Sequence, residues 1–258
     1  MADETATAEE NRAASVLNQL FLAAKERDEF EYVCALLRIR GMEDPGWDRL
    51  EETATLVREM LALSGAPLLP HTRVRLGLLL YCHVVEADPI YEVIENMLRA
   101  IEGLRMSIDP FDDLYRKSIP PSAKMVVIYL RDHARRVGQN AVADLLEWMF
   151  DDGVRNAFFH SDYILYKDEF RSREGHLAKD GRARGSLKLD EVGELINRGL
   201  VFYEGFLAVW REHRRSYKET KIIEGRFRSD GGLMPLRLLV DPKHGVYGFT
   251  SNLSPEKD

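Results

Sequence analysis

The stretch DEVGELINRGLVFYEGFLAVW, residues 190 to 210, indicates a helical protein. Its large apolar residues recur at intervals of three and four positions, which is the period of an α-helix with one apolar face. These residues are Leu195, Ile196, Leu200, Phe202, Tyr203, Phe206, Leu207 and Trp210. We therefore expect a long helix that begins at Asp190 and turns these positions toward a core.

The same periodicity recurs in the rest of the chain. Residues 8–64 repeat the helical pattern and are interrupted by glycine and a Pro-Gly-Trp turn, which predicts two or three short antiparallel helices. Further helices are expected after Pro70 and from Asp88-Pro89. The stretch 122–138 should be a helix ending with a C′ glycine, Gly138, and residues 140–160 should form another helix.

Two segments depart from this helical pattern. Residues 162–173 alternate in the manner of strands, and the glycine- and charge-rich stretch up to Gly185 predicts an exposed loop. Residues 235–251 carry strand, turn and strand signals. The predicted fold class is mainly α, a helical bundle with a small antiparallel β appendage near the C-terminus. We expect an N-terminal helical segment (1–64), a helical bundle (65–216) and a small β-hairpin extension (217–258).

Composition and charge restrict the class of protein. No apolar run reaches the roughly 18 residues that a membrane span requires, and the start MADETATAEENR lacks the features of a signal peptide. These features predict a cytoplasmic protein without a membrane partner. The two cysteines, Cys34 and Cys82, lie within helical patterns and are expected to be small core residues.

The net charge of −7 is unevenly distributed along the chain. Residues 1–60 hold 7 basic and 14 acidic residues. In contrast, segment 167–188 holds 7 basic and 4 acidic residues, and segment 209–228 holds 7 basic and 3 acidic residues. The two basic segments are candidate phosphate-binding surfaces. The alternative is solvated charge on a loop and on a helix end.

The stretch VRNAFFHSDY, residues 154–163, sets Arg155 and His160 at the spacing R-x4-H. A second match, Arg171 to His176, lies in the polar loop and lacks that apolar context. Five helical residues turn through about 140°, so Arg155 and His160 can converge only if the helix ends or bends between them. The alternative interpretation is a helix C-terminus at which the imidazole interacts favourably with the helix dipole.

The string RNAFFH, at the end of a helical segment and followed by another long helix, resembles the R-N-x3-H signature of the HEPN superfamily, in a bacterial-type member. The resemblance covers about six residues as a motif and residues 71–215 as architecture. Many HEPN domains are helical, metal-independent ribonucleases of toxin, antiviral or RNA-processing systems. The resemblance implies that Arg155 and His160 are the catalytic pair, oriented by Asn156. It also implies a homodimer that unites two motifs in one cleft, a regulatory protein partner, and neither metal nor cofactor.

The expected chemistry is RNA cleavage by the 2′-hydroxyl, which gives a 2′,3′-cyclic phosphate. The imidazole would exchange protons and the guanidinium would stabilise the charge on phosphorus. The expected RNA contacts are Asp162, Tyr163, Arg171, Arg173, Arg182 and Arg184. The rival interpretation is a catalytically silent helical protein that binds a protein or RNA partner.

Other groups of residues are weaker candidates. His83 and Glu86 share a helix face at a spacing of three, but no second such pair is present to complete a metal site, and a core or interface histidine is the simpler interpretation. The same applies to Tyr129, Asp132 and His133. The aromatic series Trp148, Phe150, Phe158 and Phe159 is expected to supply core.

Overall fold

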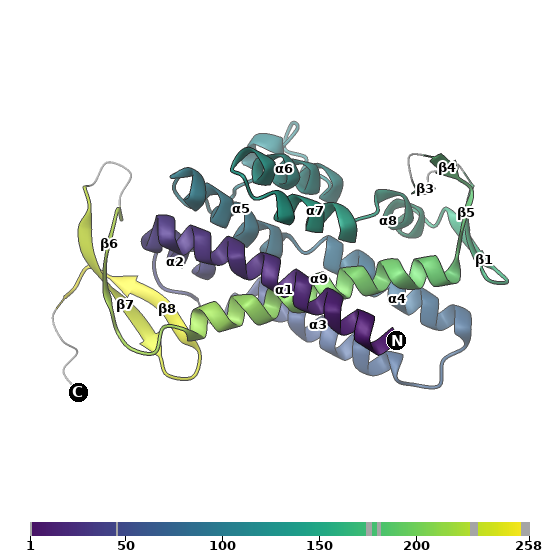
Figure 1. Ribbon diagram of the computed structural model, residues 1–258, viewed down its shortest axis with the longest axis horizontal. Helices are drawn as coiled ribbons and strands as arrows, with labels where there is room; N and C mark the ends of the chain where they lie inside the picture. The colour runs from purple at the N-terminus through teal and green to yellow at the C-terminus, as the bar shows by residue number, and fades with distance from the viewer. Residues whose placement is uncertain (1, 45, 174–176, 180–181, 228–231, 254–258) are drawn as a thin grey trace. The chain divides into compact units, whose positions relative to one another are not determined.

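The computed structural model describes residues 2–44, 46–173, 177–179, 182–227 and 232–253 (Figure 1). The chain is mainly helical and has a small antiparallel sheet near its C-terminus, which confirms the predicted fold class. In chain order the elements are α1 (Ala2–Arg27), α2 (Glu29–Leu37), α3 (Arg49–Ser64), α4 (Pro70–Val85), α5 (Asp88–Glu102), η1 (Asp112–Leu114), α6 (Ala123–Arg136), α7 (Asn140–Met149), α8 (Asp152–Phe159), β1 (Tyr163–Tyr166), β2 (Glu169–Ser172), β3 (Leu177–Lys179), β4 (Arg182–Arg184), β5 (Ser186–Lys188), α9 (Leu189–Arg215), β6 (Ile222–Gly225), β7 (Met234–Asp241) and β8 (Gly245–Thr250).

The contacts divide the chain into two compact units, each built from separate stretches of sequence. The first unit comprises residues 1–48, 88–144 and 205–258, and the second comprises residues 49–87 and 145–204. The three consecutive domains expected from the sequence stay a prediction, because the pattern of contacts does not test whether a segment folds alone.

In the first unit, α1 packs against α2 and α5, and α2 also packs against β6 and β8. The helical pattern expected in residues 8–64 is confirmed for α1, in which Leu17, Leu20, Phe21 and Ala24 are fully buried and Val16 is partly buried. However, α1 is a single helix of 26 residues rather than a short one. Strands β6, β7 and β8 pair antiparallel in that order, so the predicted hairpin of β7 and β8 gains a third strand.

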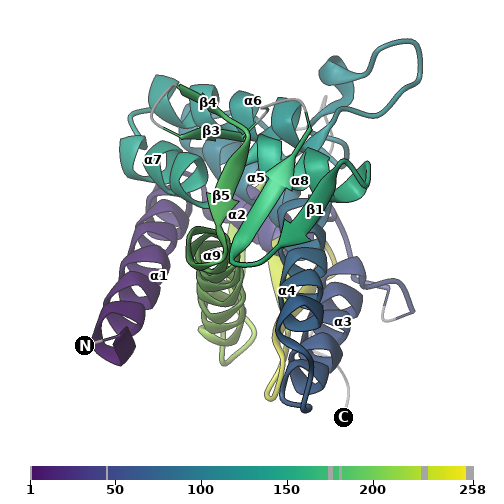
Figure 2. The ribbon, with the colours of Figure 1, turned by 90° about the vertical axis from the view of Figure 1, so that its right-hand side faces the viewer.

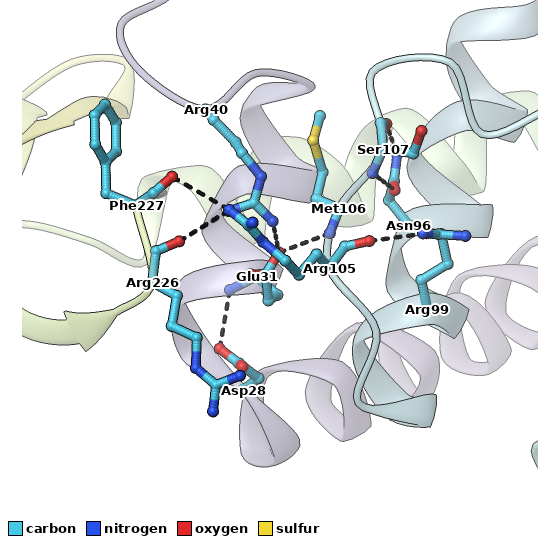
Figure 3. A network of polar contacts seen from close by, with 10 residues as sticks. All are labelled: Asp28, Glu31, Arg40, Asn96, Arg99, Arg105, Met106, Ser107, Arg226 and Phe227. Carbon is cyan, nitrogen blue, oxygen red and sulfur yellow. Dashed lines mark hydrogen bonds and ion pairs between the residues drawn. The ribbon is translucent and has the colours of Figure 1, made fainter. Parts of the chain in front are cut away.

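Polar contacts around the buried Glu31 join α2 to the loop after α5, and exposed contacts join that loop to residues 226 and 227 (Figure 3). The Glu31 carboxylate is 4% exposed, pairs with Arg40 and accepts a hydrogen bond of 2.7 Å from the backbone N of Met106. Arg105 donates from Nη2 to the carbonyl oxygens of Arg226 and Phe227, both at 3.2 Å. A buried carboxylate requires such partners, so this network fixes the chain segments around α2.

In the second unit, α4 packs against α3 and α8. Two glycines allow α4 to approach the first half of α9 closely. A Cβ on Gly199 would lie 2.7 Å from Cδ2 of Tyr81, and one on Gly77 would lie 2.9 Å from Cδ1 of Ile196. The long helix predicted from Asp190 is confirmed as α9, and most of the apolar residues quoted above are buried.

The single helix predicted over residues 140–160 is wrong, because the chain forms two helices, α7 and α8. Asp151 caps the second helix, with its Oδ1 accepting a bond of 2.9 Å from the backbone N of Val154. The Tyr81 hydroxyl, from α4, donates to the carbonyl oxygen of Met149 and accepts from the backbone N of Asp151, at 3.2 and 2.7 Å. This hydroxyl therefore satisfies backbone groups on both sides of the break.

The region between α8 and α9 forms more strands than expected. The predicted strand character of residues 162–173 is confirmed by β1 and β2, which form an antiparallel sheet with β5 in the order β1-β2-β5. The loop predicted up to Gly185 is wrong in part, because β3 and β4 pair as a short hairpin. Its sequence is too short and polar to show the alternation that marks a longer strand.

Cys34 and Cys82 are both free and buried, as expected of core residues. Burial raises the pKa of the Cys82 thiol to about 12. Among the helices of the described residues, none has the length and apolar character needed to cross a membrane. The cytoplasmic location stays a prediction.

Candidate active site

The R-N-x3-H motif occupies the whole second half of α8 and the residue that ends it. Arg155 and Asn156 lie in the helix, and His160 is its C-cap residue, with φ −85° and ψ 4°. Ser161 then adopts a left-handed conformation, with φ +54°. The backbone N of Asp162 bonds to the carbonyl oxygen of Ala157 at 2.9 Å, and that of Ser161 bonds to Phe158 at 3.1 Å. This is a Schellman ending at His160. The helix continues from Arg155 through Phe159, so it does not end or bend between Arg155 and His160, as convergence of the two side chains would require.

The Arg155 side chain is held on two sides and is 16% exposed. Its Nε and Nη2 pair with the carboxylate of Glu86, the residue that caps the end of α4. Its Nη1 donates to Oδ1 of Asn156 at 2.5 Å, and its guanidinium lies 5.4 Å from the ring centroid of Phe159. These bonds use three of the five guanidinium N–H groups, and the other two have no hydrogen-bond partner among the described residues.

His160 lies at the surface of the second unit. Its backbone N donates to the carbonyl oxygen of Asn156 at 2.9 Å, whereas its imidazole makes no hydrogen bond to the described residues. The imidazole is therefore available for proton exchange with a ligand. The described bonds of Arg155 go to Glu86 and Asn156, and none of them reaches His160.

Asn156 connects the two other members of the motif. Its side-chain oxygen accepts from Arg155, and its backbone oxygen accepts from the backbone N of His160. The side-chain bond is specific to asparagine, whereas any residue in the helix would accept the backbone bond. The orienting role that the family resemblance implies for Asn156 stays a prediction.

The aromatic residues around the motif do not form a buried core, and the prediction that they do is wrong. Phe159 is 46% exposed, and Trp148, Phe150 and Phe158 are only partly buried. They lie on the short helix α8 and at the end of α7, where fewer elements cover them. Phe158 instead begins a row of rings: Tyr163 lies 5.4 Å from Phe158 and stacks on the buried Phe170 at 5.0 Å. Figure 2 shows α8 beside β1, which carries Tyr163.

The expected RNA contacts occupy different environments. Tyr163 belongs to the row of rings, and Asp162 lies 3.9 Å from Nε of Arg173, whose side chain is 87% exposed. Arg171 is exposed and pairs with Glu169 at 2.7 Å. Arg182 and Arg184 lie in β4, and their side chains are outside the described part of the chain, as is His176.

Neither of the two weaker candidates forms the pair expected of a metal site. Glu86 is engaged by Arg155, so it is not paired with His83, whose buried Nε2 finds no partner among the described residues. His133 is buried in the first unit, with Nδ1 2.8 Å from Glu95 and Nε2 3.0 Å from Glu102. Burial raises the pKa of the Glu95 carboxyl, an effect that its hydrogen bond to His133 opposes.

Glu86 is the residue of this site that the sequence interpretation missed. It lies 69 positions before Arg155, and its spacing to His83 drew attention to the wrong partner. The one available signal was its place at the end of a predicted helix. Comparison of the chain with protein-family models, with curated proteins and with solved structures finds no match.

Proposed function

We propose that the chain is a metal-independent endoribonuclease of HEPN type. The observation that carries the proposal is an arginine fixed by Glu86 and Asn156, on a helix that ends at an exposed imidazole. Fixing a guanidinium before the ligand arrives lowers the cost of binding a phosphate, because less side-chain freedom is lost. The family resemblance alone suggests a role in toxin or antiviral defence systems.

The reaction uses a nucleophile that RNA itself carries. His160 removes the proton of a 2′-hydroxyl, and the 2′-oxygen attacks the adjacent phosphorus. The two remaining N–H groups of Arg155 stabilise the negative charge that develops on the phosphoryl oxygens. The bond from phosphorus to the 5′-oxygen breaks, and that oxygen takes a proton from a second acid. The products are a 2′,3′-cyclic phosphate and a 5′-hydroxyl.

One observation favours the rival function, a catalytically silent protein that binds a partner. All three guanidinium nitrogens of Arg155 already have protein partners, as they would in an arginine that serves only to join α4 to α8. In that case the motif is a structural helix end, and its loss should affect stability rather than RNA.

The test is incubation of the purified full chain with end-labelled RNA in EDTA, followed by identification of the product ends. Cyclic phosphate ends, and no cleavage where a 2′-deoxy nucleotide replaces the cleaved position, are the expected results. His160→Ala should abolish cleavage and leave the melting temperature nearly unchanged, because the side chain is exposed. His176→Ala, from the second R-x4-H match, should cleave like the wild type. RNA left intact by the wild type would contradict the ribonuclease proposal.

A further inference from the structure

The outer face of the sheet β1-β2-β5 carries exposed apolar and charged side chains. Along β1, Tyr163 and Leu165 are partly buried while Ile164 and Tyr166 are exposed, and Phe170 and Leu187 are buried on the neighbouring strands. One face of the sheet therefore belongs to the core of the second unit. The other face is open to solvent, which is the usual state of a small antiparallel sheet.

Tyr166 is the aromatic ring on this open face. It is 47% exposed, and two cations lie over its ring: the Arg171 guanidinium is 4.6 Å from the ring centroid, and Nζ of Lys167 is 5.4 Å from it. An exposed ring beside positive charge suits one class of ligand well. A base of single-stranded nucleic acid can take the place of a cation over such a ring, and the displaced cation can then contact a phosphate.

Glu169 holds two cations of this face in place by hydrogen bonds. Glu169, opposite Tyr166 in the sheet, accepts hydrogen bonds from Arg171 at 2.8 Å and from Lys188 at 3.2 Å. The side chains of Arg171 and Lys188 remain 44% and 56% exposed. Surface ion pairs of this kind contribute little to stability, so a phosphate can compete for these cations at small cost.

The open face follows the motif directly in the chain. His160 ends α8, and β1 begins three residues later with Tyr163, whose ring contacts Phe158 on α8. Tyr166 stands three residues further along β1, a distance of about 10 Å. Since β1 is the edge strand of the sheet, an extended ligand can pass from the helix end to the open face without crossing other strands.

We infer that the outer face of β1-β2-β5 binds single-stranded RNA, with a base stacked on Tyr166 and phosphates held by Lys167 and Arg171. The inference rests on the proposed ribonuclease function and names the class of its substrate. A base paired within a duplex has both faces covered by its neighbours, so this surface should select unpaired RNA.

The test measures the affinity of fluorescently labelled RNA in the His160→Ala background, where the probe stays intact. The probes are a single-stranded oligoribonucleotide and the same sequence in a duplex, each over a range of salt concentrations. Tyr166→Ala should weaken single-strand binding about tenfold or more, and Tyr166→Phe should retain it. Arg171→Ala should lower the slope of log affinity against log salt by about 0.7.

Tyr115 provides a matched control. It is 39% exposed in the first unit, and nearby carboxylates, foremost Asp109, raise its pKa. Because its surroundings are acidic, Tyr115→Ala should leave RNA affinity unchanged. Equal binding of single strand and duplex, or wild-type affinity in Tyr166→Ala, would overturn the inference. So would a change in oligomeric state in Tyr166→Ala without a change in RNA affinity, which would identify a protein interface.

Cleavage by the wild type separates this result from the proposed function. If the wild type leaves RNA intact while Tyr166 still controls single-strand affinity, the binding surface stands and the ribonuclease proposal fails. If the wild type cleaves RNA while Tyr166→Ala binds and cleaves equally well, the ribonuclease proposal stands and the binding surface is wrong.

Discussion

At the scale of single residues, the candidate site depends on how Arg155 is fixed. The sequence indicates the arginine, the asparagine and the histidine because they fall within six positions. It does not indicate Glu86, because contact between residues 69 positions apart is a property of the packing of α4 against α8. The Arg155 side chain is 16% exposed. Arg155→Ala should therefore cost about 1–3 kcal/mol of stability, since Glu86 loses its partner.

Glu86→Gln tests the positioning role of that carboxylate. The amide keeps the shape and one acceptor but loses the charge, so Arg155 should sample other orientations. We expect the cleavage rate constant to fall roughly 10- to 100-fold, while RNA affinity and melting temperature change little. Glu59→Gln, an exposed glutamate on α3, is the control. Unchanged cleavage would contradict the positioning role, and faster cleavage would show that the carboxylate competes with the phosphate.

His213 provides a prediction about pH and stability. Burial lowers the pKa of its imidazole to about 4, and the imidazole hydrogen bonds to the Tyr32 hydroxyl at 2.6 Å and to Asn18 at 2.8 Å. In the unfolded chain the imidazole takes up a proton near pH 6.5, whereas in the folded chain it stays neutral until about pH 4. The contribution of neutral His213 to stability is therefore complete above pH 6.5 and is lost as the pH falls toward 4. At pH 5 the loss relative to pH 7 is roughly 2 kcal/mol.

The measurement is urea unfolding of the wild type and of His213→Gln at pH 7, 6 and 5. Glutamine can hydrogen bond but does not titrate, so the stability difference between the two proteins should shrink as the pH falls. Buried Glu95, whose pKa is raised, changes stability in the opposite direction and cancels in this comparison. A difference that stays constant with pH would show that His213 does not titrate as described.

At the scale of elements, the sequence predicts what its own periodicity encodes. The helix from Asp190, the helix ending before Gly138 and the strands β7 and β8 follow from local spacing and turn residues. The break between α7 and α8 does not, because the apolar pattern continues through it and the Tyr81 hydroxyl that stabilises it lies 70 positions earlier than Asp151. Strand β6 was not predicted, because its four residues are too few to show a clear alternation and pair with the distant strand β7.

The turn between β7 and β8 depends on a glycine. Gly245 has φ +84°, and an added Cβ would lie 2.0 Å from the carbonyl oxygen of Arg214. Because that oxygen belongs to the backbone of α9, the clash cannot be relieved by a rotamer change. Gly245→Ala should cost about 3 kcal/mol or more in urea unfolding. Gly138→Ala is the control, since Gly138 has φ +80° in open space and should cost about 1 kcal/mol. Similar losses in both variants would mean that only the backbone conformation matters.

At the scale of the whole molecule, the charged segments of the sequence belong to different compact units. The acidic N-terminal residues up to Asp48 belong to the first unit, where α1 and α2 supply fully buried side chains. A variant that lacks residues 1–64 would therefore lose part of the hydrophobic core together with the acidic residues. The basic segment 167–188 lies in the same unit as the motif, whereas segment 209–228 lies in the first unit. Only the first of these segments is tied to the motif by described contacts, and an RNA-binding role for the second stays a prediction.

The last prediction concerns the number of motifs in one catalytic centre. Each chain offers one motif histidine, while the reaction needs both a base and an acid, so we expect a homodimer in which two copies of His160 face one RNA. Co-expression of two differently tagged chains, one wild type and one His160→Ala, and purification through both tags yields heterodimers. If both histidines serve one centre, these heterodimers should have almost no activity, whereas independent motifs would give about half the wild-type rate. A wild type that sediments as a monomer and still cleaves RNA would contradict the shared centre directly, and the second acid would then have to come from water or from another group near α8.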